Sequence, residues 1–292
     1  MSWYNQKEKG SKFLLKTTLF LVKFTPNFIL KFIVLMASFF YYIFSKNERK
    51  NIDKFYKNLN SKNRNTFLNF YNFSISIIDK MAVWIGKIQF KDLVLKDKDL
   101  ILKNLVNAKT GTIILASHYG NIEIARALSR TKHKVKLAIL VYNKNMMNFN
   151  NLINKISSQK IKIFEVDELD VARMIELRNF LDNGGHLCIM GDRIPLKSNK
   201  MINAKFLNQN ADFPLGSFYL AYLLKCPINA LWCVKNKNKY EIMMDEICDF
   251  LDKKSIEKCA LKYISLLEDR VRENPTMWFN FFDFWGDDEK SL

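Results

Sequence analysis

Two residues in the segment ASHYGNIEIA, residues 116–125, have the right types for acid–base chemistry. His118 carries an imidazole that exchanges protons near neutral pH, and Glu123 carries a carboxylate five residues later. In one continuous helix these side chains would point to different faces. Across a strand–turn–helix break, the carboxylate can fold back, hold the Nδ1–H and stabilise an imidazolium. The pattern therefore predicts a general base with its orienting partner, and a substrate hydroxyl as nucleophile.

The position of this pair favours function over the plainer alternative, a surface histidine followed by a capping glutamate. The apolar run GTIILAS ends at Ser117, Gly120 permits a sharp bend, and Asn121 can cap the helix that follows. A helix N-terminus at this point favours negative charge. We expect the backbone N–H groups from Gly120 to Ile122 to hold an oxyanion.

A second candidate lies in GGHLCIMGDRIP, residues 184–195. If the strands are parallel, this run delivers Asp192 and Arg193 to the same sheet edge as His118. Arg193 can bind a phosphate with two hydrogen bonds or neutralise a reacting oxygen, and Asp192 can fix its guanidinium. The alternative is a structural turn closed by an Asp–Arg pair.

The other histidines and the cysteines indicate no metal or redox site. We interpret His133 and His186 as surface or structural residues. The five cysteines contain no CxxC pair, which suggests buried or incidental thiols. The motifs GxSxG, GxxxxGK[ST], GxGxxG and HExxH are absent, so a serine hydrolase, a P-loop enzyme, a dinucleotide enzyme and a zincin have no support. No cofactor is expected.

Strand-like and helical segments alternate along most of the chain, which predicts one α/β domain over residues 51–292. We expect a central mixed, mostly parallel sheet flanked by helices. An amphipathic helix is predicted at 64–87. The expected strands are 111–117, 135–142, 161–166, 186–191, 228–234 and 240–244, and the expected helices between and after them are 121–130, 145–158, 168–182, 214–225 and 254–273.

The first 50 residues predict a membrane anchor. The segment NFILKFIVLMASFFYYIFS, residues 27–45, is apolar and long enough to cross a bilayer, with Lys31 near one end. It can span the membrane or lie in its plane, and the alternative is a hydrophobic helix packed on the domain.

The formal net charge of +17 restricts the class of partner. A surface this basic attracts anionic lipid headgroups, phosphorylated substrates, acidic carrier proteins or nucleic acid. No DNA- or RNA-binding module is recognisable, so nucleic acid is not expected as a partner. A non-catalytic basic protein that binds membranes remains the alternative to an enzyme, and its binding would be indifferent to His118.

Several segments in order carry a family resemblance: HYGNIEIARAL, GDRIP, residues 204–228, and PTMWFNFFDFW at residues 275–285. The chain is similar to the lysophospholipid acyltransferase superfamily, and within it to the bacterial lipid A late acyltransferases of the lauroyl and myristoyl type. The resemblance covers about three fifths of the chain, from Gly111 to Trp285.

This resemblance implies that His118 is the general base and Glu123 its partner. It implies an acyl carrier protein thioester as donor, a hydroxyl of a lipid A precursor or related glycolipid as acceptor, and an N-terminal membrane helix. The catalytic domain would lie on the cytoplasmic side of the cell inner membrane. Phe213, Pro214 and Gly216 would line the acyl or acceptor site, together with the loop residues Gly120 and Asn121.

Two departures from the family pattern leave the acceptor open. Typical members have Asp-Gln where this chain has Asp192–Arg193, and a Trp-x-x-His-Arg-Arg type run where this chain has WFNFFDFW. A lysophospholipid, an amino lipid or a polyene lipid is the alternative acceptor. The aromatic residues at 278–285 either seal the core or form a wall of the lipid pocket.

Overall fold

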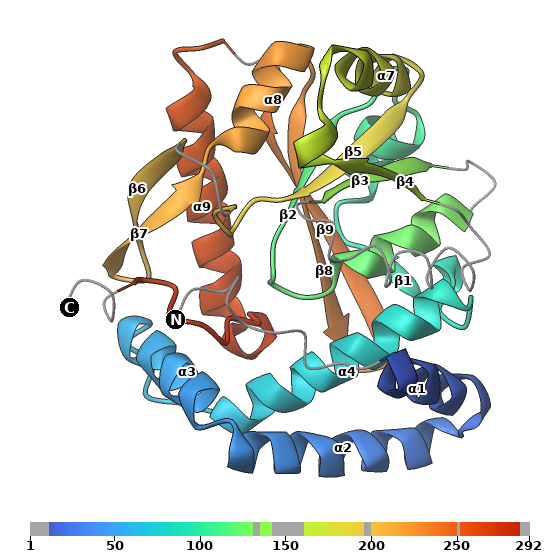
Figure 1. Ribbon diagram of the computed structural model, residues 1–292, viewed down its shortest axis with the longest axis vertical. Helices are drawn as coiled ribbons and strands as arrows, with labels where there is room; N and C mark the ends of the chain where they lie inside the picture. The colour runs from blue at the N-terminus through green and yellow to red at the C-terminus, as the bar shows by residue number, and fades with distance from the viewer. Residues whose placement is uncertain (1–11, 131–134, 142–160, 196–199, 250–251, 287–292) are drawn as a thin grey trace.

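A seven-stranded sheet forms the centre of the molecule in the computed structural model, which describes residues 12–130, 135–141, 161–195, 200–249 and 252–286 (Figure 1). The strand order is β1-β9-β8-β2-β5-β3-β4. All neighbouring strands are parallel except β8 and β9, so the predicted mixed, mostly parallel sheet is confirmed. The strands are β1 Leu93–Leu95, β2 Ile113–Ala116, β3 Lys136–Val141, β4 Lys162–Glu165, β5 Gly185–Met190, β8 Ile228–Asn236 and β9 Lys239–Cys248.

Helices flank both faces of this sheet, because the central strand β2 is apolar on both sides. Ile113 and Leu115 belong to one buried cluster, whereas Ile114 belongs to another. This alternation is the period of two that a strand imposes on its side chains. The helices of the domain are α4 Thr66–Trp84, α5 Lys98–Ile101, α7 Val171–Asp182, α8 Gly216–Leu224 and α9 Ile256–Glu273, with a π-helix at Leu102–Val106 (η3).

Short 3₁₀ helices occupy several connections, and one of them replaces a predicted α-helix. The segment expected at 121–130 is the 3₁₀ helix η4, Ile122–Arg130. The helix expected at 145–158 lies outside the described residues. The other 3₁₀ helices are η2 Phe90–Asp92, η6 Val166–Glu168 and η7 Pro275–Met277.

A second, two-stranded sheet was not predicted. It consists of β6 (Met201–Phe206) and β7 (Gln209–Pro214), paired antiparallel. Leu207 and Asn208 connect them and both have positive φ, which matches the tight turn that the twist of a hairpin favours.

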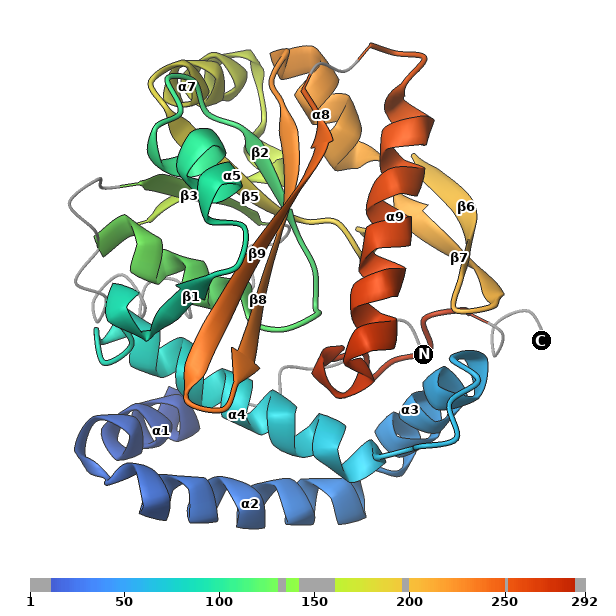
Figure 2. The ribbon, with the colours of Figure 1, turned by 180° about the vertical axis from the view of Figure 1, so that it is seen from behind.

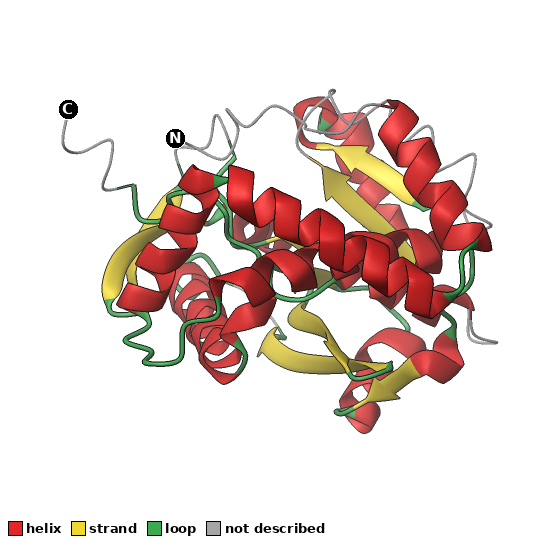
Figure 3. Ribbon diagram, turned by 90° about the horizontal axis from the view of Figure 1, so that it is seen from below, coloured by secondary structure: helices red, strands yellow, loops and turns green. Residues whose placement is uncertain are grey.

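The N-terminal helices form a layer under the carboxyl ends of the central strands (Figures 1 and 2). They are α1 Lys12–Phe24, α2 Asn27–Phe44 and α3 Lys46–Asn58. Helix α2 packs along α4 and buries Leu30, Val34 and Ser38 on one face. Seen from below, helices cover this end of the molecule (Figure 3). By length and composition α2 can cross a membrane, and yet one of its faces lies against the domain.

Candidate active site

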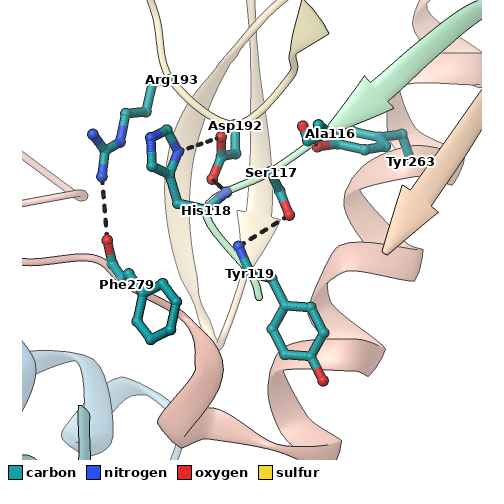
Figure 4. A network of polar contacts seen from close by, with 8 residues as sticks. All are labelled: Ala116, Ser117, His118, Tyr119, Asp192, Arg193, Tyr263 and Phe279. Carbon is teal, nitrogen blue, oxygen red and sulfur yellow. Dashed lines mark hydrogen bonds and ion pairs between the residues drawn. The ribbon is translucent and has the colours of Figure 1, made fainter. Parts of the chain in front are cut away.

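Two parallel strands bring the two candidate segments together. Strands β2 and β5 are neighbours, with Ala116 opposite Met190, and the N–H of Gly191 donates to the Ala116 carbonyl at 2.8 Å. The chain therefore leaves both strands at the same edge of the sheet. His118 follows β2 and Asp192 follows β5, as the sequence predicts (Figure 4).

Asp192 holds His118 at two points. Its Oδ1 lies 2.9 Å from His118 Nδ1, and its Oδ2 accepts the His118 backbone N–H at 2.8 Å. Asp192 is only 2% exposed, whereas the His118 side chain is 28% exposed. A buried carboxylate thus orients a ring that substrate can still reach. The prediction that Glu123 holds Nδ1 is wrong, because Asp192 occupies that position.

Burial and neighbouring charges set the ionisation of this pair. Burial acts to raise the pKa of Asp192, but His118 and Arg193 outweigh it and hold that pKa below its ordinary value. Burial, with Arg193 beside the ring, lowers the pKa of His118 against the opposing effect of Asp192. At neutral pH an ionised Asp192 accepts the Nδ1–H of a neutral imidazole. The Nε2 lone pair is then available as a base.

Glu123 lies instead in a cluster of cations and an indole. Its Oε2 accepts the Trp84 Nε1–H at 2.9 Å and pairs with Arg126, while Lys80 lies 3.7 Å from Oε1. Burial acts to raise the pKa of Glu123, but the positive charges of Lys80 and Arg126 outweigh burial, so the pKa lies below its ordinary value. Because η4 starts at Ile122, Glu123 is in its first turn and contacts Trp84 and Lys80 of α4. The Glu123 carboxylate therefore neutralises the charges of Arg126 and Lys80. Its role in catalysis stays a prediction.

Arg193 lies beside the imidazole and is held by the closing aromatic segment. Its Nη2 donates to the Phe279 carbonyl at 3.2 Å, and its guanidinium lies 4.8 Å from the centroid of the Phe282 ring. Burial lowers the pKa of Arg193 to about 10, so it is cationic at neutral pH. The expected Asp192–Arg193 hydrogen bond is replaced by these contacts, although Asp192 still attracts the guanidinium.

The loop backbone after His118 is already used for structure. The N–H of Gly120 donates to Met277 O at 2.8 Å, and that of Asn121 donates to Cys233 O at 2.7 Å. Gly120 has a φ of +73°, and a Cβ there would lie 2.1 Å from the Cys233 carbonyl oxygen. The prediction that these two N–H groups hold an oxyanion is therefore wrong. Glycine is required at position 120 because the loop after β2 lies so close to Cys233 of β8 that a Cβ would clash.

Phe213, Pro214 and Gly216 lie around the end of β7 and the start of α8. Phe213 is buried and its ring contacts those of Phe206 and Phe284. Pro214 is buried opposite Met201, and Gly216 is exposed with open space where a Cβ would be. Phe213 is thus packed in an aromatic cluster, whereas Gly216 is open to solvent, and the role of these positions in substrate binding stays a prediction.

The aromatic residues at 278–285 were expected either to seal the core or to form a wall of the lipid pocket, and this segment contacts both the core and the candidate site. Trp278 and Trp285 are buried in the core. The backbone of Phe279 meanwhile flanks the site: its N–H donates to His118 O at 2.9 Å, and its carbonyl accepts Arg193. The segment seals the core and forms one side of the candidate site.

His186 is a structural residue, as its burial and hydrogen bonds show. His186 is fully buried: its Nδ1 accepts the Thr112 N–H and its Nε2 lies 3.0 Å from Leu105 O, and burial lowers its pKa to about 4. His133 lies outside the described residues. Over the ranges that the structure covers, no group of three His, Cys, Asp or Glu side chains could hold a metal ion.

Tyr263 was missed by the sequence analysis. Its hydroxyl donates to the Ala116 carbonyl at 2.8 Å, and its ring stacks on Trp232 at 5.8 Å between centroids. A Cβ on Gly191 would lie 3.0 Å from the same ring, so glycine lets the end of β5 approach α9. Only the folded chain brings α9 to this place.

Comparison with known protein families gives one match. The family described as bacterial lipid A biosynthesis acyltransferase matches residues 6–286, more than the three fifths that carried the resemblance in the sequence. No curated protein matches the chain.

Proposed function

Because the chain belongs to the bacterial lipid A biosynthesis acyltransferase family, we propose that it transfers a fatty acyl chain from an acyl carrier protein thioester to a hydroxyl of a lipid A precursor or related glycolipid. The observation that carries the proposal is the His118–Asp192 pair, a neutral imidazole oriented by a buried carboxylate. A general base of this kind is what hydroxyl attack on a thioester requires.

In the proposed reaction, His118 Nε2 removes the proton of the acceptor hydroxyl as its oxygen attacks the thioester carbonyl. A carbon–oxygen bond forms and the carbonyl becomes an oxyanion. Collapse of this intermediate breaks the carbon–sulfur bond, and the imidazolium returns the proton to the leaving thiolate. Asp192 stabilises the imidazolium between these two steps through the Nδ1–H hydrogen bond.

Arg193 supplies the positive charge that the oxyanion needs. Its guanidinium has five N–H donors, and one Nη2 contact to Phe279 O leaves further donors for substrate. The Phe279 carbonyl and the Phe282 ring fix its plane beside the imidazole. Since the loop N–H groups of Gly120 and Asn121 are occupied, the side chain of Arg193 takes the role first assigned to them.

The N-terminal helices serve as the membrane anchor, and α2 lies in the plane of the membrane. An α-helix of 18 residues is about 27 Å long, close to the thickness of a hydrocarbon core. One face of α2 nevertheless packs on α4 through Leu30, Val34 and Ser38. A spanning orientation would detach this face from the domain.

The opposite side of these helices is apolar and exposed, which suits an in-plane anchor. Its exposed large apolar residues on α1 and α2 are Phe20, Phe24, Phe28, Ile29, Phe32, Leu35, Met36, Phe39, Phe40, Tyr41, Ile43 and Phe44. The net charge of +17 complements anionic headgroups around this face. The same basic surface attracts an acidic carrier protein, and a carrier protein donor supports an active site on the cytoplasmic side of the inner membrane.

The test is acyl transfer by the purified full-length protein in mixed micelles. Acyl carrier protein thioester and a lipid A precursor are supplied, and the products are identified by mass spectrometry. We expect the precursor to gain one acyl chain, and His118→Ala to lower the rate by about 10²- to 10⁴-fold while the protein stays folded. Normal transfer by a folded His118→Ala protein would overturn the assignment of the base.

Lipids from a deletion strain identify the acceptor independently. Loss of one acyl chain from lipid A supports the proposed acceptor. If lipid A is unchanged and another lipid is missing, the acceptor is instead a lysophospholipid, an amino lipid or a polyene lipid. The proposed chemistry at His118 stays the same.

A further inference from the structure

A cavity of about 260 Å³ lies next to the loop that carries His118, between α2, α4 and the turn that joins β8 to β9. Asn121, three residues after His118, is part of its wall, and the side chain of Asn121 donates to Ser76 O of α4 at 2.9 Å. The view from behind shows the β8–β9 turn reaching the N-terminal helices (Figure 2). The residues around the cavity are Lys31, Tyr71, Asn72, Ile75, Ser76, Asp79, Asn121, Lys235, Lys237, Tyr240, Asn274 and Met277.

Three lysines from separate parts of the chain make this cavity cationic. Lys31 comes from α2, Lys235 from the end of β8, and Lys237 from the turn. Asp79 is the only acidic residue among the described residues of the wall. Lys235 pairs with both Asp79 oxygens, at 2.7 and 2.9 Å, and lies 3.1 Å from the Tyr240 hydroxyl. Three cations and one carboxylate therefore leave two positive charges for an anion.

The position of Lys31 relates this cavity to the membrane. Lys31 interrupts the apolar sequence of α2, directly after the buried Leu30. Lys31 is exposed and lines the cavity together with Asn72 and Asp79 of α4, so its side chain lies on the α4 side of the helix. Burial raises the pKa of Asp79, and the charges of Lys235 and Lys31 act against this rise. With the apolar face of α2 in the hydrocarbon, the cavity stands at the level of the lipid headgroups.

We propose that this cavity binds the phosphate monoester group of a membrane lipid, held by Lys31, Lys235 and Lys237. Lys235 is fixed by Asp79, and the other two lysines supply the net charge. The cavity volume is sufficient for a phosphate, whose oxygens accept several lysine hydrogen bonds. The inference rests on the proposed attachment of α2 to the membrane, but not on the acyl transfer.

Vesicle flotation of the full-length protein tests the proposal. Vesicles of phosphatidylcholine alone are compared with vesicles containing phosphatidic acid, a phosphate monoester, or phosphatidylserine at equal surface charge. We expect a preference for phosphatidic acid that inorganic phosphate competes away. The Lys31→Gln/Lys237→Gln variant should lose this preference, with affinity for phosphatidic acid vesicles falling about tenfold.

A matched control removes the same charge elsewhere. Lys253→Gln/Lys258→Gln changes two exposed lysines, one just before α9 and one in its first turn, and should keep the preference. His118→Ala should also keep it, because His118 does not line the cavity. Equal loss in both lysine variants, or equal binding of wild-type protein to phosphatidic acid and phosphatidylserine, would overturn the proposal.

Calorimetric titration of inorganic phosphate into detergent-solubilised protein tests anion binding in the cavity separately from binding to a membrane lipid. Phosphate binding that requires Lys31 and Lys237 shows the cavity to be an anion site even if vesicle binding fails. Binding of free phosphate without any preference for phosphatidic acid vesicles would refute a lipid as its source.

Discussion

Two carboxylates flank the loop that follows β2, buried Asp192 and half-buried Glu123, and their partners differ completely. Asp192 accepts two N–H groups of His118, one from the ring and one from the backbone. Glu123 accepts the Trp84 indole and pairs with Arg126 and Lys80. A carboxylate bonded to a neutral ring orients a base, whereas one surrounded by cations compensates charge. The partners, and not the distance along the sequence from His118, separate the two functions.

The origin of this difference lies in the topology. Parallel pairing of β2 and β5 places the residues after each strand at one edge, so Asp192 reaches His118 from 74 positions away. Glu123 is close in sequence but lies in a 3₁₀ helix that contacts α4. Two further predictions compare these carboxylates directly.

Asp192→Asn should have the largest effect of the substitutions next to His118. The His118 backbone N–H can only donate, so it takes the amide oxygen and leaves the NH₂ facing the ring. The NH₂ cannot accept the Nδ1–H, which favours the tautomer with its proton on Nε2 and removes the base. We expect kcat to fall by about 10²- to 10⁴-fold. Steady-state acyl transfer measures this, with folding checked by thermal unfolding. Asp167→Asn, an exposed carboxylate, is the control and should be without effect.

Glu123→Gln should affect stability more than catalysis. It leaves Arg126, whose side chain is 9% exposed, without this counterion, and breaking this partly buried pair should cost about 2 kcal/mol. Thermal unfolding should show the loss, while kcat of the folded protein stays within about tenfold of wild type. Glu257→Gln, exposed at the start of α9, is the control. A folded Glu123→Gln protein as inactive as Asp192→Asn would restore Glu123 as the catalytic partner.

Arg193 should shift the pH dependence of the reaction. Burial and the Arg193 charge lower the pKa of His118, and a base must be neutral, so kcat/KM should fall only as the pH drops through this depressed pKa. Arg193→Gln removes one cause of the depression. The acid limb of the kcat/KM profile should then move to higher pH. An unchanged acid limb would show that Arg193 does not act on the imidazole.

Much of the fold was predictable because the hydrophobic pattern that marks a strand or a helix lies within the segment itself. The apolar runs at 111–117 and 186–191 predicted β2 and β5 within two residues at each end. The hairpin β6–β7 was missed because Met201 to Pro214 mixes polar and apolar residues, and its turn, Leu207–Asn208, lacks the glycine that marks most tight hairpins.

The sequence predicted where the site lies, at the edge of the sheet after β2 and β5, but it did not predict which side chains form its hydrogen bonds. The rule that parallel strands end at one edge correctly joined His118 and Asp192. It did not say which carboxylate would reach Nδ1, because that depends on how far η4 turns toward Trp84. The contacts of Tyr263 and Phe279 come from α9 and the segment after it, and no local pattern links these to β2.

The smallest expected effect concerns Cys188, the thiol nearest to the end of β5. It is buried, and burial raises its pKa to about 12, so it is protonated at neutral pH and a poor nucleophile. Its side chain belongs to the apolar cluster on one face of the sheet. Cys188→Ser should therefore retain wild-type kcat, measured in the same transfer assay. An acyl group trapped on Cys188 and found by mass spectrometry would replace direct transfer by an acyl-enzyme, and Asp192 and His118 would then serve a different nucleophile.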